Sequence, residues 1–218
     1  MDKKIYNFFM NVDSGAVTDA MYMLNLEGWT ECILPLKEGT RVFGPAFTIK
    51  ATHPRDKAEK GFAVYDIYDK WKPGDVLLID GLDSECSLMG GNIAHIVQMT
   101  GAAGIVLNGR CRDIDEIKEM DFPVFGKGPA MRLKKGIFKY TQYNVPMEFA
   151  GAHVEPGDYV LGDSDGVLVF PAKYAEEIMF LAEGIQDVEN RVAKAIKNGE
   201  NVDEIIKILK TKNIPRKH

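Results

Sequence analysis

The chain has 218 residues, 45% hydrophobic and 27% charged, with a formal net charge of −5, an ordinary globular composition that argues against a general nucleic-acid binder. No apolar run reaches the roughly 20 residues that a membrane span needs, the first residues lack a signal-peptide core, and the three scattered cysteines fit neither a disulfide framework nor a zinc site. We therefore expect a single cytoplasmic domain over residues 1–218, with no membrane partner and no direct nucleic-acid partner.

The first eighty residues predict alternating helices and strands. Asp13-Ser14 has the character of a helix N-cap, and apolar residues follow it three and four apart. Residues Val42–Thr52 predict a strand, in which Gly44-Pro45 indicates an edge or a bend. A helix is expected over about 61–70, and a short buried strand over Val76–Ile79.

The next stretch is the one around which the chain is organised. Gly90-Gly91 predicts a turn that opens a helix, and Ile105-Val106-Leu107 predicts a strand buried on both faces. Arg112-Asp113 then follows the strand closely. Because binding residues of α/β sheets collect beyond the carboxyl ends of strands, this turn is a candidate site.

The chemistry of these residues suits a small anion and a metal ion. Arg112 offers a planar fork of donors that matches a carboxylate, and Asp113 offers hard oxygens suited to Mg²⁺ or Mn²⁺. The start of the helix after Gly90-Gly91 adds unpaired N–H groups. The alternative is an ordinary surface salt bridge at a strand end. Cys111 lies between two arginines and could be a reactive thiol, but we favour a small buried packing residue.

The C-terminal third predicts strands and then helices. Residues 144–170 are rich in strand-forming residues, and Asp163-Ser164-Asp165-Gly166 predicts a tight hairpin turn. A long amphipathic helix is expected from Pro171 to Asn198-Gly199, and a short one over Val202–Leu209. These helices, about 171–210, would form an arm able to pack on a neighbouring subunit.

The spacing of the central stretch resembles a known family. Gly91 is followed by twenty residues, then Arg112-Asp113, two residues and Glu116. This pattern is similar to that of the RraA-like family, which includes 4-hydroxy-4-methyl-2-oxoglutarate aldolases, oxaloacetate decarboxylases and the regulator of ribonuclease E activity A. Three further blocks resemble the family in the same order, at 41–49, 72–81 and 156–167.

The resemblance implies both a fold and an assembly. The fold would be the swivelling β/β/α domain of the α/β class, with stacked sheets flanked by helices and a C-terminal helical arm. The assembly would be a homotrimer or a dimer of trimers, with sites near subunit interfaces.

The resemblance also implies a divalent-metal-dependent lyase that cleaves a carbon–carbon bond of a 2-oxo acid to give pyruvate. Arg112 would hold the carboxylate or keto oxygen, and Asp113 would anchor Mg²⁺ or Mn²⁺. The substrate carboxylate would lie on the backbone of Gly90, Gly91, Asn92 and Ile93. The acid that a neighbouring subunit donates to the metal would correspond to Glu189.

The chain departs from the aldolases of this family at one position. Those aldolases carry an aspartate where this sequence has Gly91, and glycine cannot hold a metal-bound water. Asp83, Glu85 and His95 are possible replacements. Glu116 is either a site residue or a helix-start acid that complements the helix dipole.

Two other functions remain open at this point. The first is a protein-binding regulator of ribonuclease activity without catalysis, although the retained Arg112-Asp113 pair favours the lyase. The second is a methyltransferase, a label that this family has carried. The sequence lacks the Gly-rich turn after a first strand that this activity predicts.

Overall fold

The computed structural model describes residues 2–54, 60–133 and 136–212. Its contacts separate two compact units. One is a mixed α/β unit of residues 28–172, and the other is a helical unit made of the residues up to Glu27 and those from Lys173 onward. Each unit is described by itself.

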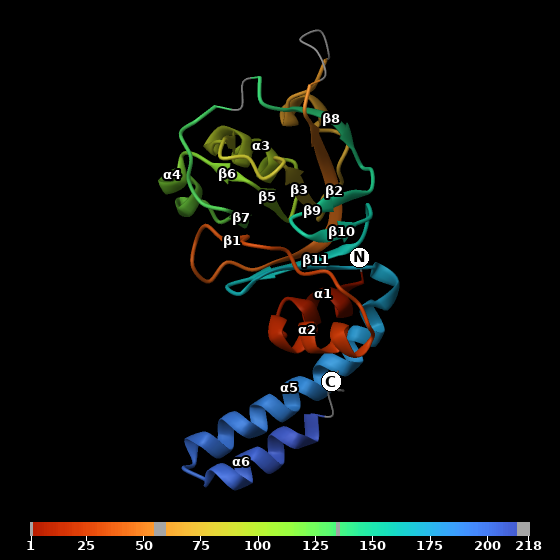
Figure 1. Ribbon diagram of the computed structural model, residues 1–218, viewed down its shortest axis with the longest axis vertical. Helices are drawn as coiled ribbons and strands as arrows, with labels where there is room; N and C mark the ends of the chain where they lie inside the picture. The colour runs from red at the N-terminus through yellow and green to blue at the C-terminus, as the bar shows by residue number, and fades with distance from the viewer. Residues whose placement is uncertain (1, 55–59, 134–135, 213–218) are drawn as a thin grey trace. The chain divides into compact units, whose positions relative to one another are not determined.

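An eight-stranded sheet is the framework of the mixed unit (Figure 1). Four neighbouring strands, β2, β3, β5 and β7, run parallel to one another. Antiparallel strands extend it, because β1 pairs with β7, β8 and β11 pair with β2, and β12 pairs with β11. The bounds are β1 Leu34–Pro35, β2 Val42–Thr52, β3 Val76–Asp80, β5 Gly104–Asn108, β7 Val124–Gly126, β8 Lys139–Tyr143, β11 Tyr159–Asp163 and β12 Gly166–Phe170.

The central strands are buried on both faces. Every residue of β3 and β5 is buried, as their continuous apolar runs predict. The unit has two clusters of buried hydrophobic residues, and alternate residues of β3 belong to different ones. Leu77 and Ile79 belong to the first cluster, and Val76 and Leu78 belong to the second. The expected α/β class is confirmed, and the sheet separates two apolar cores.

Different elements cover the two cores. Ala94 and Val97 of α3 (Gly91–Met99) and Ile117 of α4 (Ile114–Glu119) belong to the first cluster. The second takes Met147, Phe149 and Val154 from the antiparallel pair β9 (Met147–Phe149) and β10 (Ala152–Val154). The hairpin predicted at Asp163–Gly166 is confirmed, since β11 and β12 pair in register up to those two residues.

Of the two alternatives predicted for Gly44-Pro45, an edge or a bend, the edge is wrong. β2 lies inside the sheet, where residues 42–45 pair with β11 and residues 46–49 pair with β3. Glycine is required at position 44 because a Cβ there would overlap the carbonyl oxygen of Gly74. The Gly-Pro pair therefore marks a close approach of two backbones rather than an edge.

The helix predicted over 61–70 is also wrong. The structure has a 3₁₀ turn, η1, over Val64–Ile67 only. The Phe62 N–H donates to the carbonyl oxygen of Tyr140 at 3.0 Å, which holds this residue extended beside β8. Strand pairing thus overrides a local apolar pattern.

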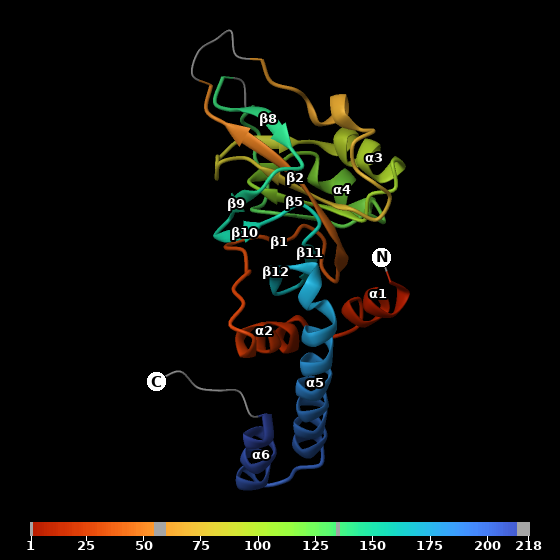
Figure 2. The ribbon, with the colours of Figure 1, turned by 90° about the vertical axis from the view of Figure 1, so that its right-hand side faces the viewer.

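The helical unit contains α1 (Lys3–Phe9), α2 (Ser14–Met23), α5 (Ala175–Lys197) and α6 (Val202–Leu209), with short 3₁₀ turns η2 (Ala172–Tyr174) and η3 (Lys210–Lys212) at its ends. Asp13 caps α2 as predicted, accepting from the Gly15 N–H at 2.9 Å. After Gly199, which has a φ of +71°, α6 runs back beside α5 (Figure 2). In the described chain, no helix is both long enough and apolar enough to cross a membrane.

Candidate functional site

A short parallel pairing brings the two halves of the predicted site together. β4 (Ser87–Met89) pairs with β6 (Arg110–Cys111), so their carboxyl ends lie at the same edge. Gly90-Gly91 follows β4, and Arg112-Asp113 follows β6. The Arg112 N–H donates to the carbonyl oxygen of Met89 at 3.1 Å, which fixes the two turns against each other.

Asp113 points back at the Gly-Gly turn. Its Oδ2 accepts the Gly91 N–H at 3.1 Å and lies 3.7 Å from Arg112 Nε. Asp113 stands at the N-cap of α4 in the left-handed region, at φ 59° and ψ 42°, and its side chain does not cap that helix. A non-glycine residue held in this strained conformation is typical of functional sites.

The two glycines leave the space that two carboxylates occupy. A Cβ on Gly90 would overlap Asp113 Oδ2, and a Cβ on Gly91 would overlap the carboxylate of Glu116. Two carboxylates therefore close directly on the turn. The N–H groups of the turn are partly used: Gly91 donates to Asp113, and Ile93 donates to the Gly90 carbonyl oxygen at 3.1 Å. Among the described residues, the N–H groups of Gly90 and Asn92 have no acceptor, so both are donors left for a ligand.

Glu116 lies against the Gly-Gly turn. It reaches the turn from α4, and its Oε1 lies 3.1 Å from Nε2 of His95 on α3. Both side chains are about half exposed, at 47% and 46%. A carboxylate from another helix thus lies beside Gly91, in contact with His95.

The two other proposed replacements are engaged elsewhere. Asp83 pairs with Lys127 at 2.6 Å, and Glu85 pairs with Arg110 at 2.8 Å. In the described residues both carboxylates are thus paired with cations, whereas Glu116 lies against the Gly-Gly turn. The structure therefore favours Glu116 over both.

Two pockets meet at Arg112. The acidic pocket, about 540 Å³, is lined by Arg112, Asp113, Asp115 and Glu116 and closed by Pro129, Ala130 and Met131. The apolar pocket, about 410 Å³, lies between Arg112 and Gly90 and the side chains of Val64, Tyr65, Leu88, Met89, Ile93 and Leu133. Both volumes suit a small-molecule ligand.

The loop after β7 forms a wall of each pocket. The Cys111 N–H donates to Gly128 at 3.1 Å, the Ala130 N–H donates to Cys111 at 2.8 Å, and the Ser87 N–H donates to Arg132 at 2.8 Å, in each case to the carbonyl oxygen. These bonds hold the loop along β6 and β4, so the pocket walls are fixed by backbone pairing.

Cys111 is a packing residue, as favoured from the sequence. It is buried, and burial, with the nearby charge of Asp113, raises the pKa of its thiol to about 12. The thiol is therefore neutral at physiological pH and is no nucleophile.

The carboxylates present fit a hard divalent ion. Among the described residues no group of three or more His, Cys, Asp and Glu side chains gathers as a complete metal cage. Mg²⁺ is usually held by one or two carboxylates and several waters. Asp113 and Glu116, both partly exposed beside the same turn, can supply that donor set.

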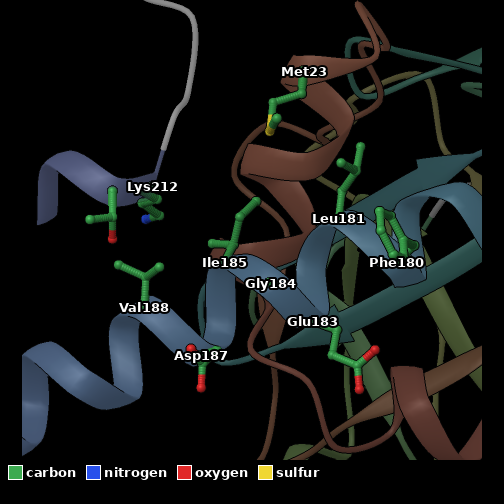
Figure 3. Close-up of a pocket in the computed structure, with 10 residues that line it drawn as sticks. Met23, Phe180, Leu181, Glu183, Gly184, Ile185, Asp187, Val188 and Lys212 are labelled. Atoms are coloured by element: carbon green, nitrogen blue, oxygen red, sulfur yellow. The ribbon is translucent and has the colours of Figure 1, made fainter. Parts of the chain in front are cut away.

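Glu189 belongs to the helical unit, on α5. It forms an ion pair with Lys212, which also pairs with Asp19 of α2 at 2.6 Å. Lys212 lines a pocket of about 440 Å³ together with apolar residues of α5 such as Ile185 and Val188 (Figure 3). The metal role predicted for Glu189 requires a second subunit and stays a prediction.

The sequence missed two parts of the site. Leu88 and Met89 had no assigned element, although their strand β4 positions the Gly-Gly turn. The apolar pocket was not predicted, because Val64, Leu88 and Leu133 are far apart in the chain. The spacing of Glu116 from Arg112 was the available signal for its place in the site.

The chain is similar to two proteins over most of its length. It is 30% identical over 199 residues to Protein DlpA of Legionella pneumophila, covering 89% of this chain but only 32% of that protein. This chain thus spans about a third of the length of that relative. It is 31% identical over 191 residues to a Halalkalibacterium halodurans protein named "Putative 4-hydroxy-4-methyl-2-oxoglutarate aldolase", covering 86% of both.

Solved structures share the fold. A crystal structure of a Pseudomonas syringae protein matches with a TM-score of 0.82 at 25% identity, covering 94% of this chain and 98% of that one. The structure of Streptomyces coelicolor RraAS2, described as an unusual member of the RNase ES inhibitor RraA protein family, matches at 0.79 and 26% identity, covering 87% and 96%. They support the fold class expected from the sequence.

The RraA-like family model, described as Aldolase/RraA, matches residues 14–169, and the chain therefore belongs to the RraA-like family.

Proposed function

We propose that this protein is a divalent-metal-dependent lyase that cleaves a carbon–carbon bond of a 2-oxo acid and releases pyruvate. One observation carries the proposal: a guanidinium and two carboxylates converge on one Gly-Gly turn. A relative named as an aldolase, covered over most of its length, supports it.

Arg112 binds the substrate in this proposal. Its closest ion pair in the described chain is loose, 3.7 Å from Asp113, and its side chain is 46% exposed. Guanidinium donors therefore remain for the carboxylate and keto oxygen of a 2-oxo acid. The Asn92 N–H, at the start of α3, is placed to add a backbone donor to the same carboxylate.

Asp113 holds the metal ion, Mg²⁺ or Mn²⁺, with waters completing its coordination. Glu189 of a neighbouring subunit is the further acid that the resemblance implies. When bound, such an ion supplies positive charge that stabilises the enolate of pyruvate.

Glu116 acts as the base. In aldol cleavage Glu116 accepts the proton of the C4 hydroxyl, and the C3–C4 bond breaks. The electron pair of that bond forms the enolate of pyruvate, which is then protonated at C3. The departing C4 fragment leaves as a carbonyl compound. Arg112 stabilises the charge that develops on the keto oxygen. Decarboxylation of oxaloacetate passes through the same enolate, so one site can perform both reactions.

The test is pyruvate release from oxaloacetate, measured against the spontaneous rate. We expect release that depends on Mg²⁺ or Mn²⁺, stops with EDTA and falls at least 100-fold in Arg112→Ala, as loss of an oxyanion-stabilising donor does. The circular dichroism spectrum of the variant should match the parent. Equal metal-dependent rates for parent and variant would exclude this site as the centre of the activity.

A second candidate function is a protein-binding regulator of ribonuclease activity without catalysis. The fold shared with Streptomyces coelicolor RraAS2, from an RNase ES inhibitor family, is the observation that favours it. The two functions separate in Arg112→Ala. A regulator would inhibit the ribonuclease equally well with the substitution, and no metal-dependent pyruvate would form with either protein.

We also propose a cytoplasmic homotrimer or dimer of trimers, because a site residue from a second subunit is part of the scheme. Light scattering coupled to size exclusion should give three or six chain masses. A monomer that retains full activity would remove Glu189 from the site.

A further inference from the structure

The apolar pocket beside Arg112 points to a substrate class. Of the described residues that line it, Arg112 is the one with a charged side chain. Leu88 and Met89 are 95% buried, and Leu133 and Tyr65 form a more exposed part of the wall, at 59% and 53% exposure. A ligand carboxylate bound by Arg112 would therefore have a hydrocarbon surface beside it.

The acidic pocket on the other side of Arg112 differs from the apolar pocket in its charged side chains. Asp113, Asp115 and Glu116 bring three carboxylates to its lining. In the apolar pocket a second substrate carboxylate would lose water, and the described lining offers it no cation besides Arg112, which already binds the first carboxylate. An apolar group has no such cost and would bury hydrocarbon against Leu88, Ile93 and Leu133.

We infer that the preferred substrate is a 4-hydroxy-2-oxo acid with an apolar substituent on C4, rather than a dicarboxylic acid. This inference rests on the proposed function. The carboxylate and keto group lie at Arg112 beside the acidic pocket, and the C4 substituent lies in the apolar pocket. A volume of about 410 Å³ accommodates a branched or aromatic group.

The walls of the apolar pocket are held in place by strand pairing, so the fold sets the proposed substrate preference. Ser87 and Leu133 form a parallel bridge, and the Ser87 hydroxyl donates to the Met89 carbonyl oxygen at 2.8 Å. Leu88 thus lies in a strand that is paired through β6 and bridged to the loop. Preformed apolar walls cannot rearrange cheaply to solvate a charge.

Binding of two uncleavable 2-oxo acids tests the inference apart from catalysis. 5-Methyl-2-oxohexanoate and 2-oxoglutarate differ only in an isopropyl group or a carboxylate on C4, which have similar shapes. Titration calorimetry with Mg²⁺ should show at least tenfold tighter binding of the first, the size of preference that an apolar pocket commonly gives. Equal or tighter binding of 2-oxoglutarate, or binding of neither, overturns the inference.

The matched cleavable pair tests the proposed function as well. 4-Hydroxy-5-methyl-2-oxohexanoate would give pyruvate and 2-methylpropanal, and 4-hydroxy-2-oxoglutarate would give pyruvate and glyoxylate. If the apolar acid binds tighter but neither substrate is cleaved, the proposed lyase fails and the pocket assignment stands. If both are cleaved and the dicarboxylic acid has the higher kcat/KM, the lyase stands and the inference fails.

A charge placed on the wall gives the decisive variant. Leu133→Lys puts a cation in the apolar pocket and should shift the binding ratio at least tenfold toward 2-oxoglutarate. Met99→Lys makes the same change in charge at an 86% exposed residue outside both pocket linings and should leave the ratio unchanged. Equal ratios in Leu133→Lys and Met99→Lys would contradict the assignment.

Discussion

Two cations, one in each unit, are paired in different ways. In the helical unit, Lys212 lies between two acids, Asp19 and Glu189, so its positive charge is more than neutralised. In the mixed unit, the ion pair of Arg112 within the described residues is a loose one with Asp113 at 3.7 Å, and both side chains are close to half exposed beside two pockets. A loosely paired charge remains available to a ligand. Arg112 is therefore the candidate for ligand binding, whereas Lys212 stabilises its own unit.

Asp113→Ala gives the largest expected effect. We expect metal stimulation of pyruvate release to fall about 1,000-fold, since the carboxylate proposed to hold the ion is lost. Stability should change little through packing, because the Asp113 side chain is 44% exposed. Steady-state kinetics over a Mg²⁺ series and urea unfolding measure the two effects.

Asp113→Gly is the matched control for backbone strain. Both variants lack the carboxylate, but glycine tolerates the φ of 59°, so it should be more stable than the alanine variant by roughly 1 kcal/mol. If Asp113→Ala proves unfolded while Asp113→Gly is native and fully active, the carboxylate is dispensable, the backbone conformation at position 113 accounts for the loss, and the contrast between the units disappears.

Glu116→Gln should lower kcat by about 100-fold, in the range that general bases contribute, while substrate binding persists. Gly91→Asp alone should lower activity, because it puts a second carboxylate beside that of Glu116 and the two repel each other. The double variant Gly91→Asp with Glu116→Ala moves the acid to the position used by the family's aldolases and should recover part of the activity. If the double variant is no more active than Glu116→Ala, an aspartate at position 91 does not replace the Glu116 carboxylate.

Glu189→Gln addresses the helical side of the comparison. If Glu189 reaches the metal of a neighbouring subunit, we expect at least a tenfold rise in the Mg²⁺ concentration needed for half-maximal rate. Lys212→Met is the control, since it removes the same ion pair but leaves the carboxylate. An identical metal dependence in both variants and the parent would assign Glu189 to the ion pair alone.

Asp13→Ala should give the smallest effect and touch only stability. Loss of the N-cap bond to Gly15 is expected to cost about 1 kcal/mol in the free energy of unfolding, with kcat/KM unchanged. Thermal unfolding and the pyruvate assay check both. A change in activity without a change in stability would show that the division of roles between the units is too simple.

Local signals predicted the helical unit and the central strands well. The cap at Asp13 and the end at Gly199 are side-chain and backbone features of a few neighbouring residues. The apolar runs of β3 and β5 are long enough to indicate burial on both faces. The helix expected over 61–70 failed, because pairing of Phe62 with Tyr140 depends on residues nearly eighty positions apart.

The site was predicted in part. The spacing from Gly91 to Glu116 identified the residues, but not the pairing of β4 with β6 that brings them together. The sequence offers Asp83, Glu85 and His95 as possible replacements for the missing acid, with His95 the least favoured, and it does not show their partners. In the structure it is the Glu116 carboxylate that lies against Gly91. The order of residues in a chain does not specify which carboxylate occupies a given space.

Periodicity and short spacings in the sequence were enough for the α/β class and the boundaries of the last helix, and the ordered blocks around Arg112-Asp113 carried the resemblance to the family. Only the tertiary structure decided that two glycines make room for two carboxylates, and that Val64, Leu88 and Leu133 enclose an apolar pocket beside the arginine. Those arrangements arise from packing between segments distant in the chain, where the volume of a side chain and the register of a strand matter more than local preference.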